Sequence, residues 1–384
     1  MEVEVDKILS ALKTSLSLGI PPPRPLTSLI FVDRVEEVRA LLRDVEGVIE
    51  RGVGLSRLIV GGAGMGKSTL IEYLREYLFS SRNVVFGYVE LRKFSDVRPA
   101  ELSKKLYAAL LDSLEDSEER RGRELLTHIS AVLHEKFSGF ADRLALRIRR
   151  RISDKVRRRF EGIKGCEAAA RALALMVLDD LNPAMYDYLR GIRTLEPDEA
   201  LAVKEALGFR IPWKLEEASF VDSFVTVVNA ARLAGYEAVV VAIDELEMLM
   251  GWRRDMIERF LPKLSAYVES CKLCPCYLIL ASTPEFWSGS GKTVSRLYKF
   301  LYQRLDPTKI SLAELSREDV LALTLKLYKL YREAYGAEAL RGVDERALAI
   351  ETYERVGGHP RSALQYIFQE LEERVIRVES RVRR

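Results

Sequence analysis

Residues 61–69 read Gly61-Gly62-Ala63-Gly64-Met65-Gly66-Lys67-Ser68-Thr69. The apolar run Leu58-Ile59-Val60 precedes them, and a helical pattern of apolar residues between Leu70 and Leu78 follows. A glycine-rich loop ending in Lys-Ser between a strand and a helix matches the phosphate-binding pattern G-x-x-x-x-G-K-[ST]. The glycines let backbone N–H groups point at an anion, and the helix start adds the positive end of its dipole. The stretch therefore predicts a nucleotide site rather than an ordinary glycine-rich turn.

Each residue from Gly61 to Thr69 is expected to line a site for ATP or ADP. Lys67 can reach the β- and γ-phosphates, and the Ser68 hydroxyl can ligate Mg²⁺. A second part follows the apolar run Ala238–Ile243, which ends in Asp244-Glu245. An acidic residue at the carboxyl end of a buried strand is placed to hold Mg²⁺, which is the role expected of Asp244. Glu245 is expected to orient and polarise an attacking water, unless the two are simply a solvated carboxylate pair.

Two further groups are candidates for contact with the γ-phosphate. Thr283, or its neighbour Ser282, ends the apolar run 276–281, although a hydroxyl there can also simply start the turn before Pro284. Arg361 follows Pro360 at the start of the last helix, where the helix dipole disfavours a cation unless an anion compensates it. An exposed first-turn arginine is the alternative for Arg361.

Helical segments alternate with apolar strands, which predicts an α/β fold with a parallel sheet and helices on both faces. Residues 123–160 are expected to be one helix, residues 293–304 another, and everything after Ile310 helical. The expected organisation is an N-terminal helix with a Pro-rich linker (1–25), a nucleotide-binding core (26–114 and 216–312), a helical insertion (115–215) and a C-terminal helical lid (313–384).

Composition narrows the class of protein. The chain has 384 residues, 30% of them charged, and a net charge of only +3, so a nucleic-acid contact would have to come from a local patch. No apolar run reaches the roughly 20 residues that span a bilayer, and the first residues do not resemble a signal peptide. A cytoplasmic protein without a membrane contact is expected. Three Asn and three Gln against 60 Lys+Arg and 57 Asp+Glu are typical of hyperthermophiles.

Residues 143–164 form the strongest local patch of positive charge, with ten Lys/Arg against two acids. Leu144, Ile148, Ile152, Val156 and Phe160 recur every fourth residue, so the segment is predicted to be one helix with a basic outer face. This helix is the candidate contact for DNA or RNA, and a merely solvated face is the alternative.

Three cysteines, Cys271, Cys274 and Cys276, have nearly the spacing of metal ligands. Zinc, a Cys271–Cys274 disulfide and plain thiols all stay open, and plain thiols are favoured because no fourth ligand is evident.

These motifs, in this order, resemble those of AAA+ ATPases. The phosphate loop 61–68 resembles Walker A, residues 239–245 resemble Walker B, and Thr283 and Arg361 resemble sensor 1 and sensor 2. More narrowly, the chain resembles the ATP-binding proteins of BREX phage-defence systems and their archaeal relatives, over about residues 30–100 and 220–378. The narrower likeness lies in 235–247, 282–287, 302–305 and 358–361. Origin-recognition initiators and STAND signalling ATPases share much of this core.

The resemblance implies further site residues. Phe31, Val32 and Arg34 would lie near the adenine, although Asp33 stands where the family usually has glycine. An arginine that acts in trans across a homo-oligomer would precede the lid, with Arg304 the better candidate and Arg296 the second. Both are also explained as surface arginines.

The expected function is ATP binding and Mg²⁺-dependent hydrolysis, coupled to a change between core and lid and directed at nucleic acid in defence, replication or repair. A STAND-like signalling scaffold that turns over slowly is the main rival. A small-molecule kinase is disfavoured because it needs no water-activating Glu245.

Overall fold

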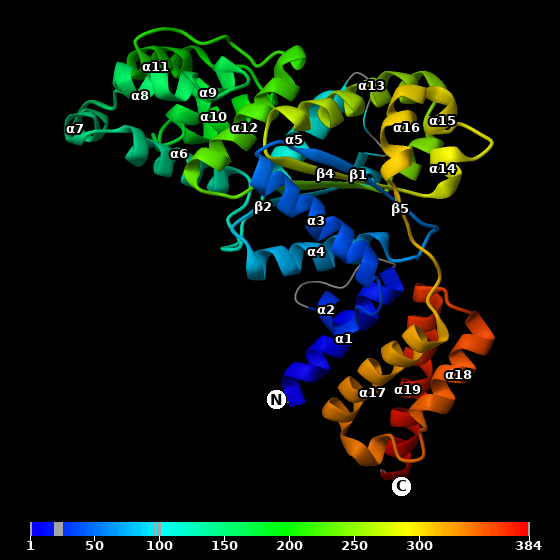
Figure 1. The fold of residues 1–384 in the computed structure, drawn as a ribbon. Coiled ribbons are helices and arrows are strands. Elements are labelled where there is room, and N and C mark those ends of the chain that lie inside the picture. The colour runs from blue at the N-terminus through cyan, green and yellow to red at the C-terminus, as the bar shows by residue number, and fades with distance from the viewer. Residues whose placement is uncertain (1, 19–25, 95–96, 98–100, 383–384) are drawn as a thin grey trace. The chain divides into compact units, whose positions relative to one another are not determined.

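The computed structural model describes residues 2–18, 26–94, 97 and 101–382. Its centre is a parallel five-stranded sheet with the strand order β2-β3-β4-β1-β5 (Figure 1). The strands are β1 (Leu55–Val60), β2 (Val85–Glu90), β3 (Val239–Asp244), β4 (Cys276–Ser282) and β5 (Ile310–Ser311). The predicted α/β class with a parallel sheet is confirmed.

The central strands explain why two runs of the sequence are wholly apolar. Every residue of β3 and of β4 is buried, as expected for parallel strands covered by helices on both faces. β2 pairs with β3 in a register that sets Val85 beside Val239 and Glu90 beside Asp244. The carboxylates that end these two strands are therefore neighbours at one edge of the sheet.

The short strand β5 was not predicted. Ile310 pairs with Ile59 and Ser311 with Val60, and the Leu312 N–H donates to the Val60 carbonyl at 2.8 Å. Two residues are too few to show the alternation by which a strand is recognised in sequence. The expectation that only helix follows Ile310 is wrong at this point.

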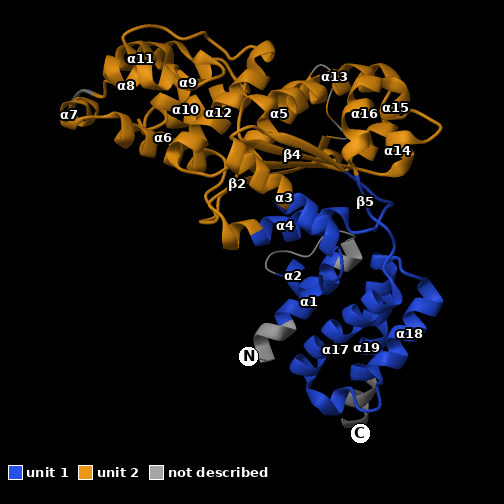
Figure 2. Ribbon diagram, in the orientation of Figure 1, with its two compact units in different colours: residues 1–42, 59–77, 310–384 blue, residues 43–58, 78–309 orange. Residues whose placement is uncertain are grey.

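Contacts divide the chain into two compact units (Figure 2). Unit 1 comprises residues 1–42, 59–77 and 310–384, and unit 2 comprises residues 43–58 and 78–309. The first helices are α1 (Glu2–Leu18), α2 (Thr27–Ile30), α3 (Val35–Arg51) and α4 (Lys67–Ser81). The last are α17 (Arg317–Ala339), α18 (Glu345–Val356) and α19 (Pro360–Val382). The Pro-rich stretch 19–25, predicted to be a linker, lies outside the described residues.

The C-terminal helices begin where their caps predict. The Ser316 hydroxyl accepts from the Asp319 N–H at 3.1 Å, and the Asp319 carboxylate accepts from the Ser316 N–H at 2.8 Å, which forms a capping box at the start of α17. Gly336 has a φ of 80° and kinks this helix, whose last turn reaches Ala339. The core of unit 1 is apolar and joins α1, α17 and α19, with Leu12, Tyr331 and Ile367 at its centre.

Unit 2 contains most of the helices, which include those between β2 and β3. They are α5 (Leu102–Ser113), α6 (Arg123–Phe137), α7 (Phe140–Arg149), α8 (Asp154–Glu161), α9 (Glu167–Leu175), α10 (Asn182–Leu189), α11 (Pro197–Leu207) and α12 (Phe220–Ala234). The remaining ones are α13 (Arg254–Ser270), α14 (Pro284–Ser288), α15 (Val294–Leu297) and α16 (Lys299–Leu305).

Segments 123–160 and 143–164 are not single helices. The first is divided into α6, α7 and α8. Ser138 and Gly139 are extended and separate α6 from α7, and Arg150 takes a left-handed φ of 48° and ends α7. The Ile152 N–H leaves the helical pattern and donates to the Ala206 carbonyl at 2.9 Å. Ser153 then caps α8 by accepting from the Val156 N–H at 3.3 Å. Every-fourth spacing did not reveal the break, because Ile152 is buried on either description.

The predicted helix 293–304 is likewise broken. Tyr298, with φ −149° and ψ 77°, separates α15 from α16. Arg296 and Arg304 therefore belong to different helices.

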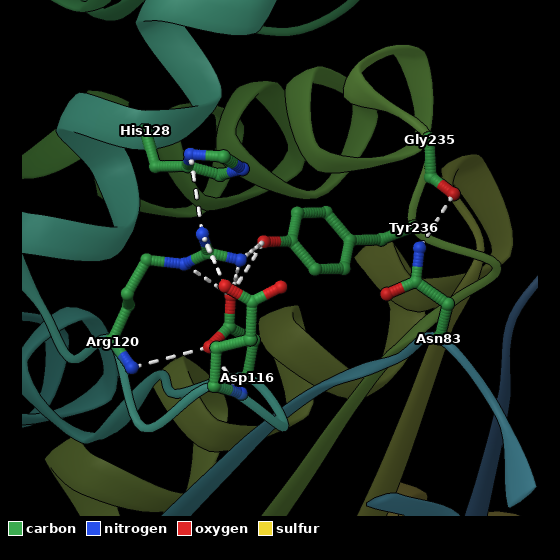
Figure 3. A network of polar contacts seen from close by, with 7 residues as sticks. Asn83, Asp116, Arg120, His128, Gly235 and Tyr236 are labelled. Atoms are coloured by element: carbon green, nitrogen blue, oxygen red, sulfur yellow. Dashed lines mark hydrogen bonds and ion pairs between the residues drawn. The ribbon is translucent and has the colours of Figure 1, made fainter.

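A buried polar network ties the segment after α5 to the entry of β3 (Figure 3). The carboxylate of Asp116, 1% exposed, accepts from the Tyr236 hydroxyl at 2.7 Å and from Arg120 Nε at 2.8 Å. Burial alone would raise the pKa of Asp116, but the hydrogen bonds from Tyr236 and Arg120 outweigh it and lower that pKa. Nearby, Glu115 makes an antiparallel bridge to Phe86, which covers part of the edge strand β2.

None of the helices in the described ranges is both long enough and apolar enough to cross a membrane.

Candidate functional site

The glycine-rich loop has the predicted setting in unit 1, between β1 and α4. Gly64 and Gly66 have φ values of 78° and 90°, in the left-handed region where glycine is favoured. The Met65 N–H donates to the Gly62 carbonyl at 3.2 Å, and Leu70 continues the first helical turn by donating to Gly66 at 2.8 Å. These contacts fold the loop back onto the first turn of α4.

Lys67 begins α4 and is held inside the loop. Its side chain is 7% exposed, and its ammonium donates to the carbonyls of Gly61 at 2.7 Å and Gly62 at 3.2 Å. Ser68 and Thr69 follow in the first turn of the same helix. A nearly buried cation at the base of a glycine loop is the arrangement that a phosphate group requires.

The start of α19 packs on the apex of the loop within the same unit. The His359 Nε2–H donates to the Ala63 carbonyl at 2.9 Å, while Nδ1 lies 3.0 Å from the Ser362 hydroxyl and accepts from its N–H at 3.3 Å. A Cβ on Gly64 would lie 2.6 Å from His359 Cε1 and 3.2 Å from Arg361 Cβ. Gly64 is thus required for close approach as well as for its φ, and Pro360-Arg361 begin their helix beside the loop.

Arg34 contacts the opposite end of the loop. It is 5% exposed, and its Nη2 donates to the Ala313 carbonyl at 2.6 Å and to the Met65 carbonyl at 3.4 Å. Asp33 and Arg34 both take left-handed conformations, with φ values of 57° and 68°. This backbone explains why glycine suits position 33, and aspartate is among the residues that tolerate it best.

Phe31 presents an aromatic surface in unit 1. Its ring stacks on that of Tyr73 from α4, with centroids 3.9 Å apart and planes 8° from parallel. Val32 packs against the core formed by α1, α17 and α19. The Phe31 carbonyl accepts from Lys326, whose pKa is lowered by burial.

The predicted carboxylates lie in unit 2 at the carboxyl end of β3. Asp244 is fully buried, and its oxygens accept from the Tyr88 hydroxyl at 2.8 Å and from the Glu245 N–H at 2.7 Å. Glu90, its partner in the register of β2, is bound by Arg92 at 2.6 Å and by Lys93 at 2.5 Å. A buried carboxylate that is held in a fixed position is suited to a hard cation.

Glu245 has the most unusual environment of the candidate residues. Its φ of 60° is left-handed, and its Oε2 is buried without a hydrogen bond in the described part of the chain. The nearest cation among the described residues is Arg92, whose Nε lies 3.5 Å from Oε2. Burial raises the pKa of Glu245; Arg92 opposes this, and Asp244, Glu90 and Glu247 raise the pKa further. Such a carboxylate is poised to accept a proton.

Thr283 and Ser282 end β4 in the same unit. Thr283 is 7% exposed, and its N–H donates to Glu247 at 3.2 Å. Ser282 is completely buried, and its hydroxyl donates to the Thr283 carbonyl at 3.3 Å. Thr283 is the more accessible of the two hydroxyls.

Of the two arginines proposed to act in trans, Arg304 has a partner in its own chain. Its Nε lies 3.0 Å from the Glu269 carboxylate, and its side chain is 39% exposed. Arg296 is exposed on α15.

Each of the two units has an oxygen donor of a kind that could hold Mg²⁺. The Ser68 hydroxyl and the buried Asp244 carboxylate are oxygen donors, which Mg²⁺ prefers. Cys271, Cys274 and Cys276 are free buried thiols, and no three His, Cys, Asp or Glu side chains in the described ranges gather into a metal site. The pKa of Cys276 is raised by a hydrogen bond with Cys271 and by burial, so the Cys276 thiol stays protonated.

Sequence reasoning missed His359 as a contact of the loop and the carboxylates Glu90 and Glu247 beside Glu245. Glu90 could have been identified from the sequence, because it ends a strand just as Asp244 does. The contact between His359 and Ala63 joins residues 296 positions apart, so no local sequence pattern predicts it.

Comparison with known proteins gives a family. The model of the family described as BREX system ATP-binding protein BrxC/D matches residues 4–379. No curated protein matches the chain. Among solved structures, the chain is similar to a Walker-type ATPase of Pyrococcus abyssi, with 16% identity, 91% of this chain and 77% of that one covered, and a TM-score of 0.39. It is also similar to the Orc1 protein of Aeropyrum pernix in complex with DNA, with 12% identity, 94% and 68% covered, and a TM-score of 0.39.

Proposed function

This chain belongs to the BREX system ATP-binding protein BrxC/D family, and from that premise we propose that it hydrolyses ATP with Mg²⁺. The observation that carries the proposal is the glycine loop with nearly buried Lys67 at its base. In this proposal residues 26–114 and 216–312 are the nucleotide-binding core, 313–384 the lid and 115–215 a helical insertion.

Positioning and charge neutralisation would supply most of the catalysis. Residues 61–69 bind the phosphates with Lys67, and Phe31, Val32 and Arg34 lie toward the adenine. Ser68 and Asp244 would hold Mg²⁺, which when bound neutralises charge on the phosphates. Glu245 takes a proton from the attacking water, consistent with its raised pKa. Thr283, Arg361 and a partner's Arg304 would meet the γ-phosphate.

The hydrogen bond between His359 and Ala63 supports coupling between nucleotide and lid. A change in loop shape when phosphate binds would move a carbonyl to which the lid is attached. Arg34, bonded to the carbonyls of Met65 and Ala313, extends the same link to the segment that leads into α17. Nucleotide state would thereby bias the position of α17–α19.

One substitution at each residue distinguishes the role of Lys67 in binding ATP from the role of Glu245 in hydrolysing it. Lys67→Ala should abolish ATP binding, because it removes the buried phosphate cation. Glu245→Gln should bind ATP normally and lose at least about 100-fold in turnover, as expected when a general base is removed. Binding is measured with a fluorescent ATP analogue and turnover by phosphate release. Wild-type turnover by Glu245→Gln would show that another group activates the water.

We also propose that the protein couples ATP hydrolysis to an action on nucleic acid, which it contacts through the basic segment 143–164. Its arginines on α7 and α8 support this, and the test is ATP turnover with and without DNA or RNA. Stimulation by nucleic acid supports the proposal. Turnover of less than about one per minute in both conditions, with tight nucleotide binding, would instead identify a nucleotide-gated scaffold.

A further inference from the structure

α7 carries an exposed apolar edge among arginines. Phe140 is 80% exposed and Leu144 is 46% exposed. Residues four apart lie on the same face of a helix, so the two side chains are neighbours. Figure 1 shows α7 at the outer end of the helical group α6–α11. An aromatic ring this open to water needs an explanation, because burying it would be favourable by about 2 kcal/mol.

Arginines surround this edge and continue beyond it. Arg143, Arg147, Arg151, Arg158 and Arg159 are exposed, and among the described side chains none of them has an acidic partner within 4.0 Å. By contrast, Arg150 pairs with Asp180 at 2.8 Å, and Arg157 pairs with Asp154 at 3.1 Å. The five unpaired guanidinium groups therefore form an uncompensated basic surface, called here the α7–α8 surface together with Phe140 and Leu144.

The packing of α8 keeps its arginines at the surface. Val156 and Phe160 are buried, and the Phe160 ring packs against His134 and Phe137 of α6, with centroids 4.9 and 5.4 Å apart. The Arg158 and Arg159 side chains consequently face solvent. The left-handed Arg150 turns the chain between the helices, so the basic surface spans two helices rather than one.

We propose that the α7–α8 surface binds single-stranded nucleic acid, with Phe140 stacking on an unpaired base and the arginines holding phosphates. This inference rests on the proposed action on nucleic acid and names its class. In a duplex the faces of the bases are covered by their neighbours, so an open phenyl ring finds a partner only on a single strand. Arginine's planar fork suits phosphate oxygens, and it also stacks on bases.

An anionic membrane surface is the rival class, and the structure favours it less. Helices that lie in a membrane interface bury a long apolar face. On α7 the exposed large apolar side chains described are Phe140 and Leu144, and Leu146 is half-buried. On α8 the apolar side chains point inward, so its arginines lie beside no exposed apolar face.

Binding is measured by the fluorescence anisotropy of a labelled single strand and of the matching duplex, over a range of salt. Phe140→Ala should weaken single-strand binding about 5- to 150-fold, the loss of one stacked base, and leave duplex binding unchanged. Phe140→Trp should retain affinity and add an indole signal that is quenched by the single strand. Trp213→Ala, at a 53% exposed aromatic of the same unit, is the matched control and should change nothing.

The arginines are tested by salt dependence. With one phosphate contact for each of the five arginines and about 0.7 per contact, the log–log salt slope for the single strand should be about −3.5. The triple change Arg147→Gln, Arg151→Gln and Arg158→Gln should reduce that slope by about 2. The same loss of charge at the exposed lid residues Arg332, Arg341 and Arg346 is the control and should leave it unaltered.

The outcomes separate this inference from the proposed function. Equal affinity for duplex and single strand, unaffected by Phe140→Ala, overturns the single-strand inference while nucleic-acid action stands. No binding to either nucleic acid at low salt overturns both. Binding to phosphatidylserine vesicles that Phe140→Ala abolishes, without nucleic-acid binding, assigns the surface to membranes and also overturns the inference.

Discussion

At the scale of single residues, Glu245 has a backbone conformation and a carboxylate environment that both lower the stability of the fold. Its backbone is left-handed, a conformation that disfavours side chains other than glycine. Its carboxylate lies among Asp244, Glu90 and Glu247, and Arg92 is the cation that compensates them among the described residues. Sequence identified Glu245 from its place after an apolar strand, but its strain and its acidic neighbours come from tertiary contacts.

This environment makes a prediction for pH and stability. Because the pKa of Glu245 is raised in the folded state, that state holds its proton more tightly than the unfolded chain. The wild-type protein therefore loses stability as pH rises through the folded-state pKa. Glu245→Gln does not titrate, so at pH 8 it should melt about 1–3 °C above wild type, with the difference vanishing at pH below the ordinary glutamate value of about 4.3. Thermal melts across pH measure this, with exposed Glu285→Gln as control. A difference independent of pH would contradict it.

At the scale of elements, the sequence was informative wherever a cap or a long periodic run marked an end. Capping is local chemistry that can be read from sequence: Ser316 and Asp319 mark the start of α17, and Pro197 and Gly208 mark the two ends of α11. The break at Arg150 carries no such mark, and it depends on a hydrogen bond from Ile152 to distant Ala206. β5 exists only because Ile310 and Ser311 lie beside β1. Features that depend on partners distant in sequence, such as this break and β5, were therefore not predicted.

The contact between α19 and the loop gives a prediction at this scale. His359→Ala removes the donor to the Ala63 carbonyl, and a lost neutral hydrogen bond of about 1 kcal/mol should weaken ATP binding about fivefold. Ser362→Ala removes a contact that orients the ring and should act in the same direction with a smaller effect. Titration calorimetry with ATP measures both. Unchanged affinity in His359→Ala would show that the contact does not organise the loop.

At the scale of the whole molecule, the order of the motifs along the chain predicted an AAA+ ATPase, and the narrower likeness in residues 235–247, 282–287, 302–305 and 358–361 predicted the family. The division into units was not predictable in the same way. Residues 59–77 belong to unit 1, whereas Asp244, Glu245 and Thr283 belong to unit 2. β1 and α4 each pass from one unit to the other, so contacts far apart in sequence set the boundary.

The proposed role of Arg304 in trans depends on the assembly of several copies of the chain. Its ion pair with Glu269 at 3.0 Å offers a purely structural role, but exposed pairs of this kind contribute about 0–1 kcal/mol. If Arg304 acts in trans, Arg304→Ala should keep ATP affinity and lose about 1,000-fold in turnover, as for an arginine finger. Glu269→Gln breaks the same ion pair while leaving the arginine, so it should keep turnover. Equal losses of turnover in Arg304→Ala and Glu269→Gln would show that Arg304 has only a structural role.

Mixing experiments then test whether the arginine crosses between copies. In an oligomer that joins Arg304→Ala with Lys67→Ala subunits, some sites combine an intact loop with an intact arginine from a neighbour. Phosphate release should therefore recover partially on mixing, although each variant alone is inactive. The recovery should depend on protein concentration, because it requires association, and light scattering on the same samples should detect that association. A protein that stays monomeric at every concentration with full turnover needs no arginine in trans, and Arg304 would then leave the catalytic set.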